Sequence, residues 1–168
     1  METLSALKQA ESTLSLVGDK INNLSAKIED VVFRAQRLAS AKKNNLKSPD
    51  TMFGYDLQNL RRDVRTFTNE IGSLPNVIGG IERAAEYNED AIRYAQSVMR
   101  LCERVSKQAK SLADQAQIAH NHIRESDFKI EAWYLAQETE QLAQRAQTLP
   151  TSANKIVLRV SSPPSSSP

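Results

Sequence analysis

Residues 3–43, TLSALKQAESTLSLVGDKINNLSAKIEDVVFRAQRLASAKK, carry an apolar side chain alternately every three and four positions. These positions are Leu7, Ala10, Leu14, Val17, Ile21, Leu24, Ile28, Val31, Ala35 and Leu38. The spacing keeps one stripe of side chains on one face of a helix over many turns, which is typical of coiled coils and helical bundles. Gly18 costs about 1 kcal/mol of helix propensity, but the heptad continues in phase on both sides of it. We therefore expect one long helix here.

The composition of the 168-residue chain favours an all-α fold. With 40% hydrophobic and 25% charged residues it is within the range of a globular domain, and its length predicts one domain. Only 5% of the residues are aromatic and five are glycine, which disfavours a many-stranded sandwich or barrel.

A second helix is predicted to begin near Asp50, because Ser48 and Pro49 are a typical N-cap residue and first-turn proline. Its apolar stripe is Leu57, Leu60, Val64, Phe67, Ile71 and Leu74. The stretch 72–76, GSLPN, predicts a break, and the glycines at 79–80 weaken any helix that follows it.

A third helix is predicted over residues 81–124, with two apolar stripes one position apart. The first stripe is Ile81, Ala84, Asn88, Ala91, Ala95, Val98, Cys102, Val105, Ala109, Leu112, Ala116, Ala119 and Ile123, and the second includes Ala85, Ile92, Met99 and Ala113. So wide a face needs more than one packing partner. Asn88 lies where a polar group can fix helix register, and Cys102 is predicted to be a small buried residue.

The fourth predicted helix begins near Ser126 and ends at Pro150. Its stripe is Phe128, Ala132, Leu135, Thr139, Leu142, Ala146 and Leu149. Short connections favour antiparallel neighbours, so we expect an elongated antiparallel bundle of about four helices over residues 1–150. The alternative is a long kinked helical hairpin or coiled coil, because no Gly or Pro interrupts residues 81–149.

The flanks of the first stripe argue against self-pairing of the first helix. Lys20, Lys27 and Arg34 occupy one flank, whereas Gly18, Ser25, Val32 and Ala39 occupy the other. A parallel two-stranded coil needs opposite charges on its two flanks, and this pattern lacks them. The first helix is therefore interpreted as a member of the chain's own bundle.

Residues 151–168 differ in composition from the rest of the chain. The run KIVLRV at 155–160 is β-prone, and SSPPSSSP at 161–168 is a low-complexity end that cannot bury enough apolar surface to fold alone. In isolation we expect a mobile tail. The functional alternative is a docking strand that pairs with a partner through Ile156, Val157, Leu158 and Val160.

Charge and hydropathy place limits on partners and location. The net charge of +2 is too small to indicate a nucleic-acid or membrane partner. The first residues lack a basic segment followed by an apolar one, and no apolar stretch approaches the roughly 18 residues of a membrane span. We expect a cytoplasmic protein without a transmembrane segment; export without a signal sequence, or incorporation into an assembly, stays open.

The sequence contains no recognisable catalytic, cofactor or metal motif. His120 and His122 diverge by about 200° on a helix, and neither follows a Glu at the i−3 spacing of di-iron bundles. Phosphate-binding and dinucleotide-binding glycine motifs are also missing. We therefore predict no enzyme activity, no cofactor and no metal.

Basic residues cluster in the first two predicted helices and could form one patch at one end of the bundle. The members are Arg34, Arg37, Lys42, Lys43, Lys47, Arg61, Arg62 and Arg65. Such a patch could bind nucleic acid or an anionic membrane surface. Asp50, Asp56 and Asp63 are interspersed and no aromatic platform is evident, so a solvated face is the favoured interpretation.

Trp133 and Tyr134 are adjacent, so both cannot point fully inward from one helix. We expect core or boundary packing for this pair, with an interface as the alternative. The leading hypothesis is a structural or protein-interaction protein that acts as scaffold, adaptor or assembly subunit. Its partners are proteins, with a homo-oligomer or larger assembly included.

Overall fold

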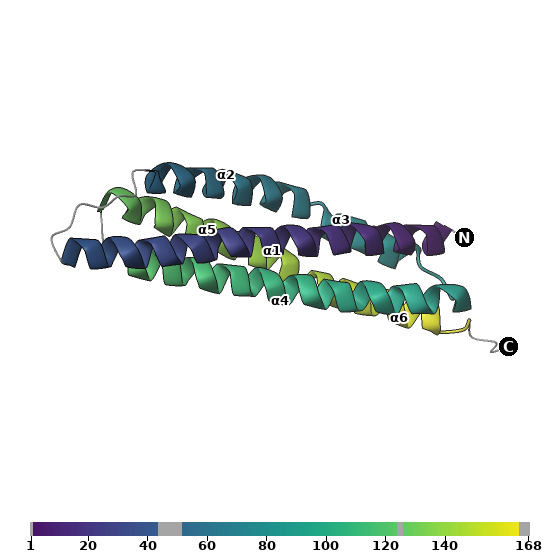
Figure 1. Ribbon diagram of the computed structural model, residues 1–168. Coiled ribbons are helices and arrows are strands. Elements are labelled where there is room, and N and C mark those ends of the chain that lie inside the picture. The colour runs from purple at the N-terminus through teal and green to yellow at the C-terminus, as the bar shows by residue number, and fades with distance from the viewer. Residues whose placement is uncertain (1, 44–51, 124–125, 165–168) are drawn as a thin grey trace.

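The computed structural model is an elongated bundle of helices (Figure 1). It describes residues 2–43, 52–123 and 126–164, and this part of the chain contains no strand. The elements in chain order are α1 (Glu2–Lys43), α2 (Phe53–Ile71), α3 (Leu74–Ala84), the 3₁₀ helix η1 (Glu89–Ala91), α4 (Ile92–His122), α5 (Ser126–Gln147) and α6 (Leu149–Ser161). The predicted all-α bundle is confirmed.

The helices form four rods: α1, then α2 with α3, then α4, then α5 with α6 (Figure 1). Successive rods run in opposite directions, and the main contacts are α1 with α4, α4 with α5 and α6, and α2 with α5. Neighbours α1 and α4 run parallel. Gln108 donates to Asn22 at 3.2 Å, and one heptad onward on both helices Gln115 donates to Glu29 at 3.2 Å. The bundle therefore combines antiparallel neighbours with parallel pairs.

The predicted apolar stripes form the core. Every position predicted on the stripes of residues 7–38 and 57–74 is buried. On the long stripe of residues 81–123, Ala84 is exposed and Asn88 is half-buried, while the other positions are buried. Each fully buried Leu, Ile or Val side chain contributes about 1.5–3 kcal/mol relative to exposure, so these stripes carry the stability of the fold.

The two exceptions mark a break that the sequence prediction missed. The helix expected over residues 81–124 is wrong at its start, because α3 ends at Ala84, Ala85 is extended and α4 begins at Ile92. Asn88 does not fix register on a stripe; its side chain accepts from the Asp90 N–H as the cap of η1. The Asn88 N–H in turn donates to the Val160 carbonyl at 3.1 Å, which anchors the link on α6. An N-cap residue followed by acidic residues was the available signal.

A Leu-Pro pair begins the second helix of each broken rod. Pro75 lies in the first turn of α3 and Pro150 in the first turn of α6, where a missing N–H costs nothing. The break at 72–76 is confirmed, as is the break near Ser126. Placing the end of the fourth helix at Pro150 was wrong, because α5 ends at Gln147 and Pro150 belongs to the next helix. The predicted cap at Ser48 and Pro49 lies outside the described residues.

Two arginines from the α5–α6 rod donate to carbonyls at the helix ends of the α2–α3 rod. Arg145 donates to the Thr68 carbonyl at 3.1 Å, and Arg159 donates to the Glu82 carbonyl at 2.8 Å. Cations are favourable at helix C-termini because of the helix dipole. At the first of these contacts, a Cβ on Gly72 would lie 3.0 Å from Arg145 Nη1, so the glycine permits the approach.

The segment expected to be a β-prone tail is instead the helix α6. Ala153, Ile156 and Val160 are fully buried and continue the four-three-four spacing from Leu149. That spacing, rather than the β-branched composition, decides the structure, because α3 and α4 offer an apolar surface to cover. The boundary drawn at residue 150 therefore falls inside α6. Ile156 and Val160 serve the core and are not free to pair as a docking strand.

Candidate functional site

Three ion pairs join α1 to α2 at heptad spacing. Lys20 pairs with Glu70 at 2.8 Å, Lys27 with Asp63 at 3.0 Å, and Arg34 with Asp56 at 2.8 Å. Each step of seven residues forward on α1 matches a step of seven back on α2, as two antiparallel helices require. These pairs line the same side of α1 and fix the register of α2 against it.

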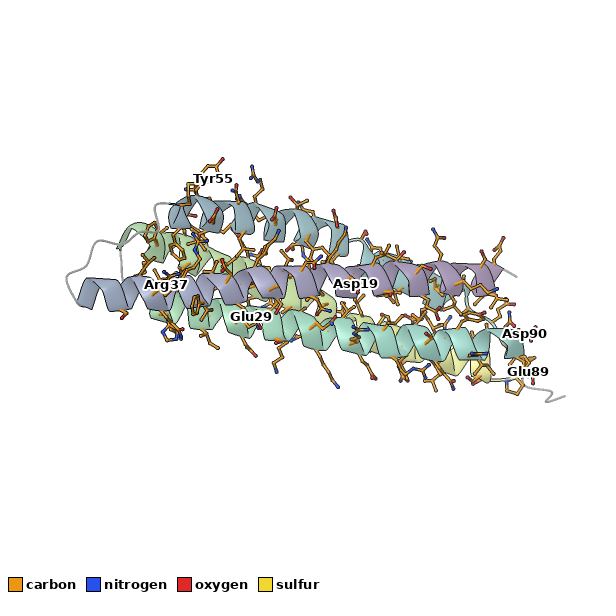
Figure 2. All side chains as sticks on the ribbon, viewed as in Figure 1. Asp19, Glu29, Arg37, Tyr55, Glu89 and Asp90 are labelled. Atoms are coloured by element: carbon orange, nitrogen blue, oxygen red, sulfur yellow. The ribbon has the colours of Figure 1, made fainter. Side chains whose placement is uncertain are left out.

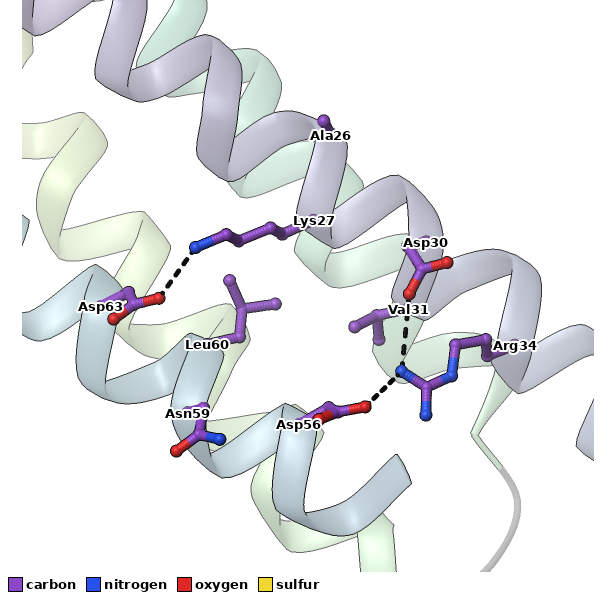
Figure 3. Close-up of a pocket in the computed structure, with 9 residues that line it drawn as sticks. All are labelled: Ala26, Lys27, Asp30, Val31, Arg34, Asp56, Asn59, Leu60 and Asp63. Atoms are coloured by element: carbon purple, nitrogen blue, oxygen red, sulfur yellow. Dashed lines mark hydrogen bonds and ion pairs between the residues drawn. The ribbon is translucent and has the colours of Figure 1, made fainter. Parts of the chain in front are cut away.

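A groove of about 420 Å³ lies between α1 and α2, and the last two of these pairs cross it (Figure 3). Its floor includes Val31 and Leu60, and Arg34 also contacts Asp30 at 3.5 Å. The charged flank noted on the first helix is thus matched within the chain. The sequence analysis did not identify Glu70 as the partner of Lys20. The signal was that Asp56, Asp63 and Glu70 follow one another at intervals of seven residues, as Lys20, Lys27 and Arg34 do.

A second charged cluster joins α2 to α5. Glu131, Tyr134 and Glu138 share one face of α5 because they are three and four positions apart, and this face lies against Arg61. The Arg61 guanidinium donates to Glu131 and, at 2.9 Å, to Glu138 Oε1. Its carbon lies 4.7 Å from the centre of the Tyr134 ring, within cation–π distance.

Arg61 is largely buried in this cluster, with 14% of its side chain exposed. Desolvation by burial disfavours its charge, but hydrogen bonds and the negative charges of Glu138 and Glu131 outweigh that effect and raise the pKa of Arg61. The guanidinium is therefore a fixed cation. It holds three side chains of α5 in place at one end of the bundle.

Trp133 lies beside Tyr134, with ring centres 5.1 Å apart and ring planes at 70°. Both rings are exposed, Trp133 by 48% and Tyr134 by 43%. The two rings line a pocket of about 520 Å³ together with Lys129 and Ile130 of α5 and His120 of α4. Neither ring lies in the core, so that part of the prediction is wrong, because the buried face of α5 is already formed by Ala132, Leu135 and Ala136.

A polar pocket of about 340 Å³ adjoins the charged cluster on the α2 side. Its lining includes Tyr55, Arg61, Arg62, Arg65 and Glu131. Tyr55 projects from the first turn of α2 away from the other helices (Figure 2). We call the combined region the α2–α5 surface; its members are Tyr55, Arg61, Arg62, Arg65, Lys129, Ile130, Trp133 and Tyr134, with His120 at its edge.

The structure separates the residues of the predicted basic patch. Arg34 lines the groove between α1 and α2, and Arg37 lies 5.9 Å from the ring of Phe33 on its own helix. Arg61, Arg62 and Arg65 line the polar pocket beside α5. The side chains of Lys42 and Lys43, and the whole of Lys47, lie outside what the structure describes. Tyr134, the ring in contact with Arg61, comes from α5 and could not be identified from α1 and α2 alone.

The remaining candidates for chemistry lie apart from one another. Cys102 is free and fully buried as predicted, and burial, with the charge of Glu103, raises the pKa of its thiol to about 12. His120 lies beside Trp133, and its Nδ1 is 3.4 Å from Gln117 Nε2. Among the described residues, no three His, Cys, Asp or Glu side chains come close enough to hold a metal ion.

Comparison with protein-family models, with curated proteins and with solved structures gives no match for this chain. No helix in the described ranges combines the length and the apolar content needed for a bilayer span. The functional argument therefore depends on the surfaces themselves.

Proposed function

We propose that this chain is a non-enzymatic interaction protein, a helical bundle that acts as scaffold, adaptor or assembly subunit by presenting a preformed surface to protein partners. One observation carries the proposal: Trp133 and Tyr134 are exposed side by side, and Tyr134 packs against Arg61, which Glu131 and Glu138 hold by ion pairs. Trp, Tyr and Arg are the residues most enriched at binding hot spots. Side chains that are ordered before binding lose little entropy on association.

Site-specific photo-cross-linking tests this proposal in the cell of origin. A photoreactive residue replaces Ile130 on the α2–α5 surface, or Leu16 on α1 as a matched control, since both side chains are 63% exposed. We expect position 130 to cross-link a defined partner protein, and we expect position 16 not to cross-link that protein. Equal cross-linking from both positions, or none from position 130, contradicts the proposal.

A second candidate function, binding to nucleic acid or an anionic membrane surface, rests on Arg62 and Arg65. Both are exposed at i, i+3 beside Tyr55. Arg34 and Arg61 argue against it because carboxylates already neutralise them. Fluorescence anisotropy with single-stranded nucleic acid and sedimentation with anionic vesicles test it. This candidate requires binding that weakens with salt and is lost in Arg62→Glu with Arg65→Glu.

We also propose a reducing, cytoplasmic location. Its support is a single cysteine, Cys102, which is buried and has no disulfide partner in a chain with one cysteine. Subcellular fractionation with antibody detection checks the location, and recovery in a membrane or extracellular fraction contradicts it.

A further inference from the structure

We infer that the α2–α5 surface binds an acidic amphipathic segment of a protein partner. In this arrangement apolar side chains of the segment contact Ile130 and Trp133, and its carboxylates contact Arg62 and Arg65. The inference rests on the proposed function and adds to it the binding face and the chemistry of the partner.

The apolar part of the site is the pocket around Trp133. Its volume of about 520 Å³ is enough for one or two large side chains, and Ile130, Trp133 and Tyr134 supply apolar walls. Ile130 is more exposed than either ring. An apolar anchor from a partner removes these three side chains from water together, which is the usual source of hot-spot affinity.

The charges around the pocket favour a partner segment that carries negative charge. Arg61 offsets the charge of one of the two carboxylates Glu131 and Glu138, and the three further cations Arg62, Arg65 and Lys129 outnumber the one that is left. Arg62, Arg65 and Lys129 are exposed, and none of them forms an ion pair with another described residue. Among the described residues, Arg62 donates only to the neutral amide of Asn59. The exposed cations therefore favour Asp and Glu on the partner.

Glu140 marks the limit of this basic region along α5. It is exposed and lies one heptad beyond Trp133, about 10 Å along the helix. An acidic segment therefore gains most by extending from the Trp133 pocket toward α2, rather than toward the middle of the bundle.

The two pockets adjoin each other, so one short segment can contact both. Tyr134 lines the apolar pocket, Arg61 lines the polar pocket, and the two side chains are in contact with 4.7 Å between guanidinium and ring centre. A helix with apolar residues on one face and carboxylates beside them matches this pair of adjoining pockets.

Selection from a displayed library of random 16-residue peptides tests the inference against the full-length chain. Enriched peptides are synthesised with a fluorescent label and their affinities measured by anisotropy. We expect an excess of Asp and Glu together with large apolar residues. Trp133→Ala should weaken binding about tenfold or more, and Arg62→Glu with Arg65→Glu by a similar factor.

Lys107→Glu with Lys110→Glu is the matched charge control, because these lysines are also exposed at i, i+3 but lie on α4. We expect less than about a twofold change for this variant, a figure within the range of remote rim charges. Circular dichroism confirms that each variant keeps its helix content. Neutral or basic enriched peptides, or affinities that Trp133→Ala leaves unchanged, overturn the inference.

Other occupants of the surface give distinct results. A dimer in sedimentation that Trp133→Ala abolishes assigns the face to a second copy of the chain and overturns the inference. Binding to phosphatidylserine vesicles that Trp133→Ala abolishes assigns it to a membrane, with the same consequence. If position 130 cross-links a protein but the selected peptides are not acidic, the proposed function stands and only the inference fails.

Discussion

The two parallel pairs of rods in this bundle are built differently. In α1 and α4, unbroken helices meet through small residues and amides, with Gly18 beside Gln108 and Ser25 donating to Gln115 Oε1 at 2.8 Å. The α2–α3 and α5–α6 rods are both broken and meet through arginines. Three of those arginine contacts, from Arg61, Arg145 and Arg159, join residues 77 positions apart.

This difference has a physical origin. In an unbroken helix the interior backbone N–H and C=O groups are hydrogen-bonded within the helix. The neighbouring helix therefore supplies no partner for them and can pack closely through small residues. A broken rod has additional helix ends, and a long cationic side chain from the neighbouring rod can donate a further hydrogen bond to the carbonyls there. Arg145 and Arg159 at the breaks fix the register of the two rods, and so does Arg61 through Glu131 and Glu138. Arg61 also contacts the exposed Tyr134. Core packing in one pair and polar contacts in the other should therefore respond differently to mutation.

The largest effect is expected in the core beside the unbroken pair. Leu112 on α4 is fully buried, so Leu112→Ala removes packed methyl groups and leaves a cavity. The free energy of unfolding should fall by about 2–5 kcal/mol. Urea unfolding followed by circular dichroism measures it, with Leu16→Ala, at an exposed position of α1, as a control that should change stability by less than about 0.5 kcal/mol. Equal losses for the two variants contradict this account of the core.

The next effect distinguishes a buried polar cluster from a surface ion pair. Arg61→Ala leaves Glu131 and Glu138 without their cation, and Glu138 Oε2 already lacks a hydrogen-bond partner among the described residues. We expect a loss of about 2 kcal/mol, since unpaired charges in a partly buried site are costly. Lys20→Ala breaks a half-exposed pair with Glu70 and should cost about 0–1 kcal/mol.

Arg61→Lys refines this test, because it keeps the charge but loses the two-pronged hydrogen bonding. Its stability should fall between that of the wild type and that of Arg61→Ala in the same urea experiment. A stability for Arg61→Ala above that of Lys20→Ala would show that the cluster does not hold the broken rods together.

Alkaline pH should weaken the contribution of Cys102 on α4 to the free energy of unfolding. Burial, with Glu103, raises the pKa of its thiol from 9.0 to about 12, so the native state keeps the proton after the unfolded state has released it. The contribution is complete below pH 9 and declines as the pH rises toward 12. At pH 10 the stability advantage of the wild type over Cys102→Ala should be smaller than at pH 8 by about 1.4 kcal/mol.

Urea unfolding of both proteins at the two pH values measures this difference. Thiol titration gives an independent readout: a chromogenic disulfide reagent should leave Cys102 unmodified at pH 8 until urea unfolds the chain. Rapid modification of the native protein would place the thiol outside the core.

The smallest effect concerns the close approach of α1 and α4. Gly18→Ala gains up to about 1 kcal/mol of helix propensity, but the new Cβ would lie 3.3 Å from Gln108 Oε1, a buried atom without a hydrogen-bond partner among the described residues. We expect a larger gain in the Gln108→Ala background than in the wild type. A double-mutant cycle measures the coupling, and additivity would show that the side chain of Gln108 yields freely.

Much of the fold follows from local sequence. The heptad stripes predicted which side chains are buried, and Ser126 marked the start of α5. The break at Ala85 was missed because no Gly or Pro signals it. Its stability comes from Asn88 and from the Val160 carbonyl of α6, a partner remote in sequence.

Local composition misled at both ends of the α5–α6 rod. The β-branched run of residues 155–160 is helical because α3 and α4 bury Ile156 and Val160, and tertiary packing outweighs a small intrinsic propensity. Trp133 and Tyr134 are exposed because alanine and leucine already fill the inner face of α5. In both cases the neighbouring helices decide the structure, and the type of the residue does not.

The sequence by itself determined the all-α class, the inward faces of α1, α2 and α4 and the buried state of Cys102, because heptad spacing reports the direction of each side chain around its own axis. Only the tertiary structure decided which helices are neighbours, that α1 and α4 run parallel, and that Arg61 of α2 lies beneath Tyr134 of α5. The reason is that register and partner choice arise from contacts between residues far apart in the chain. The α2–α5 surface is made of such contacts, so the periodicity of a single helix could not predict it.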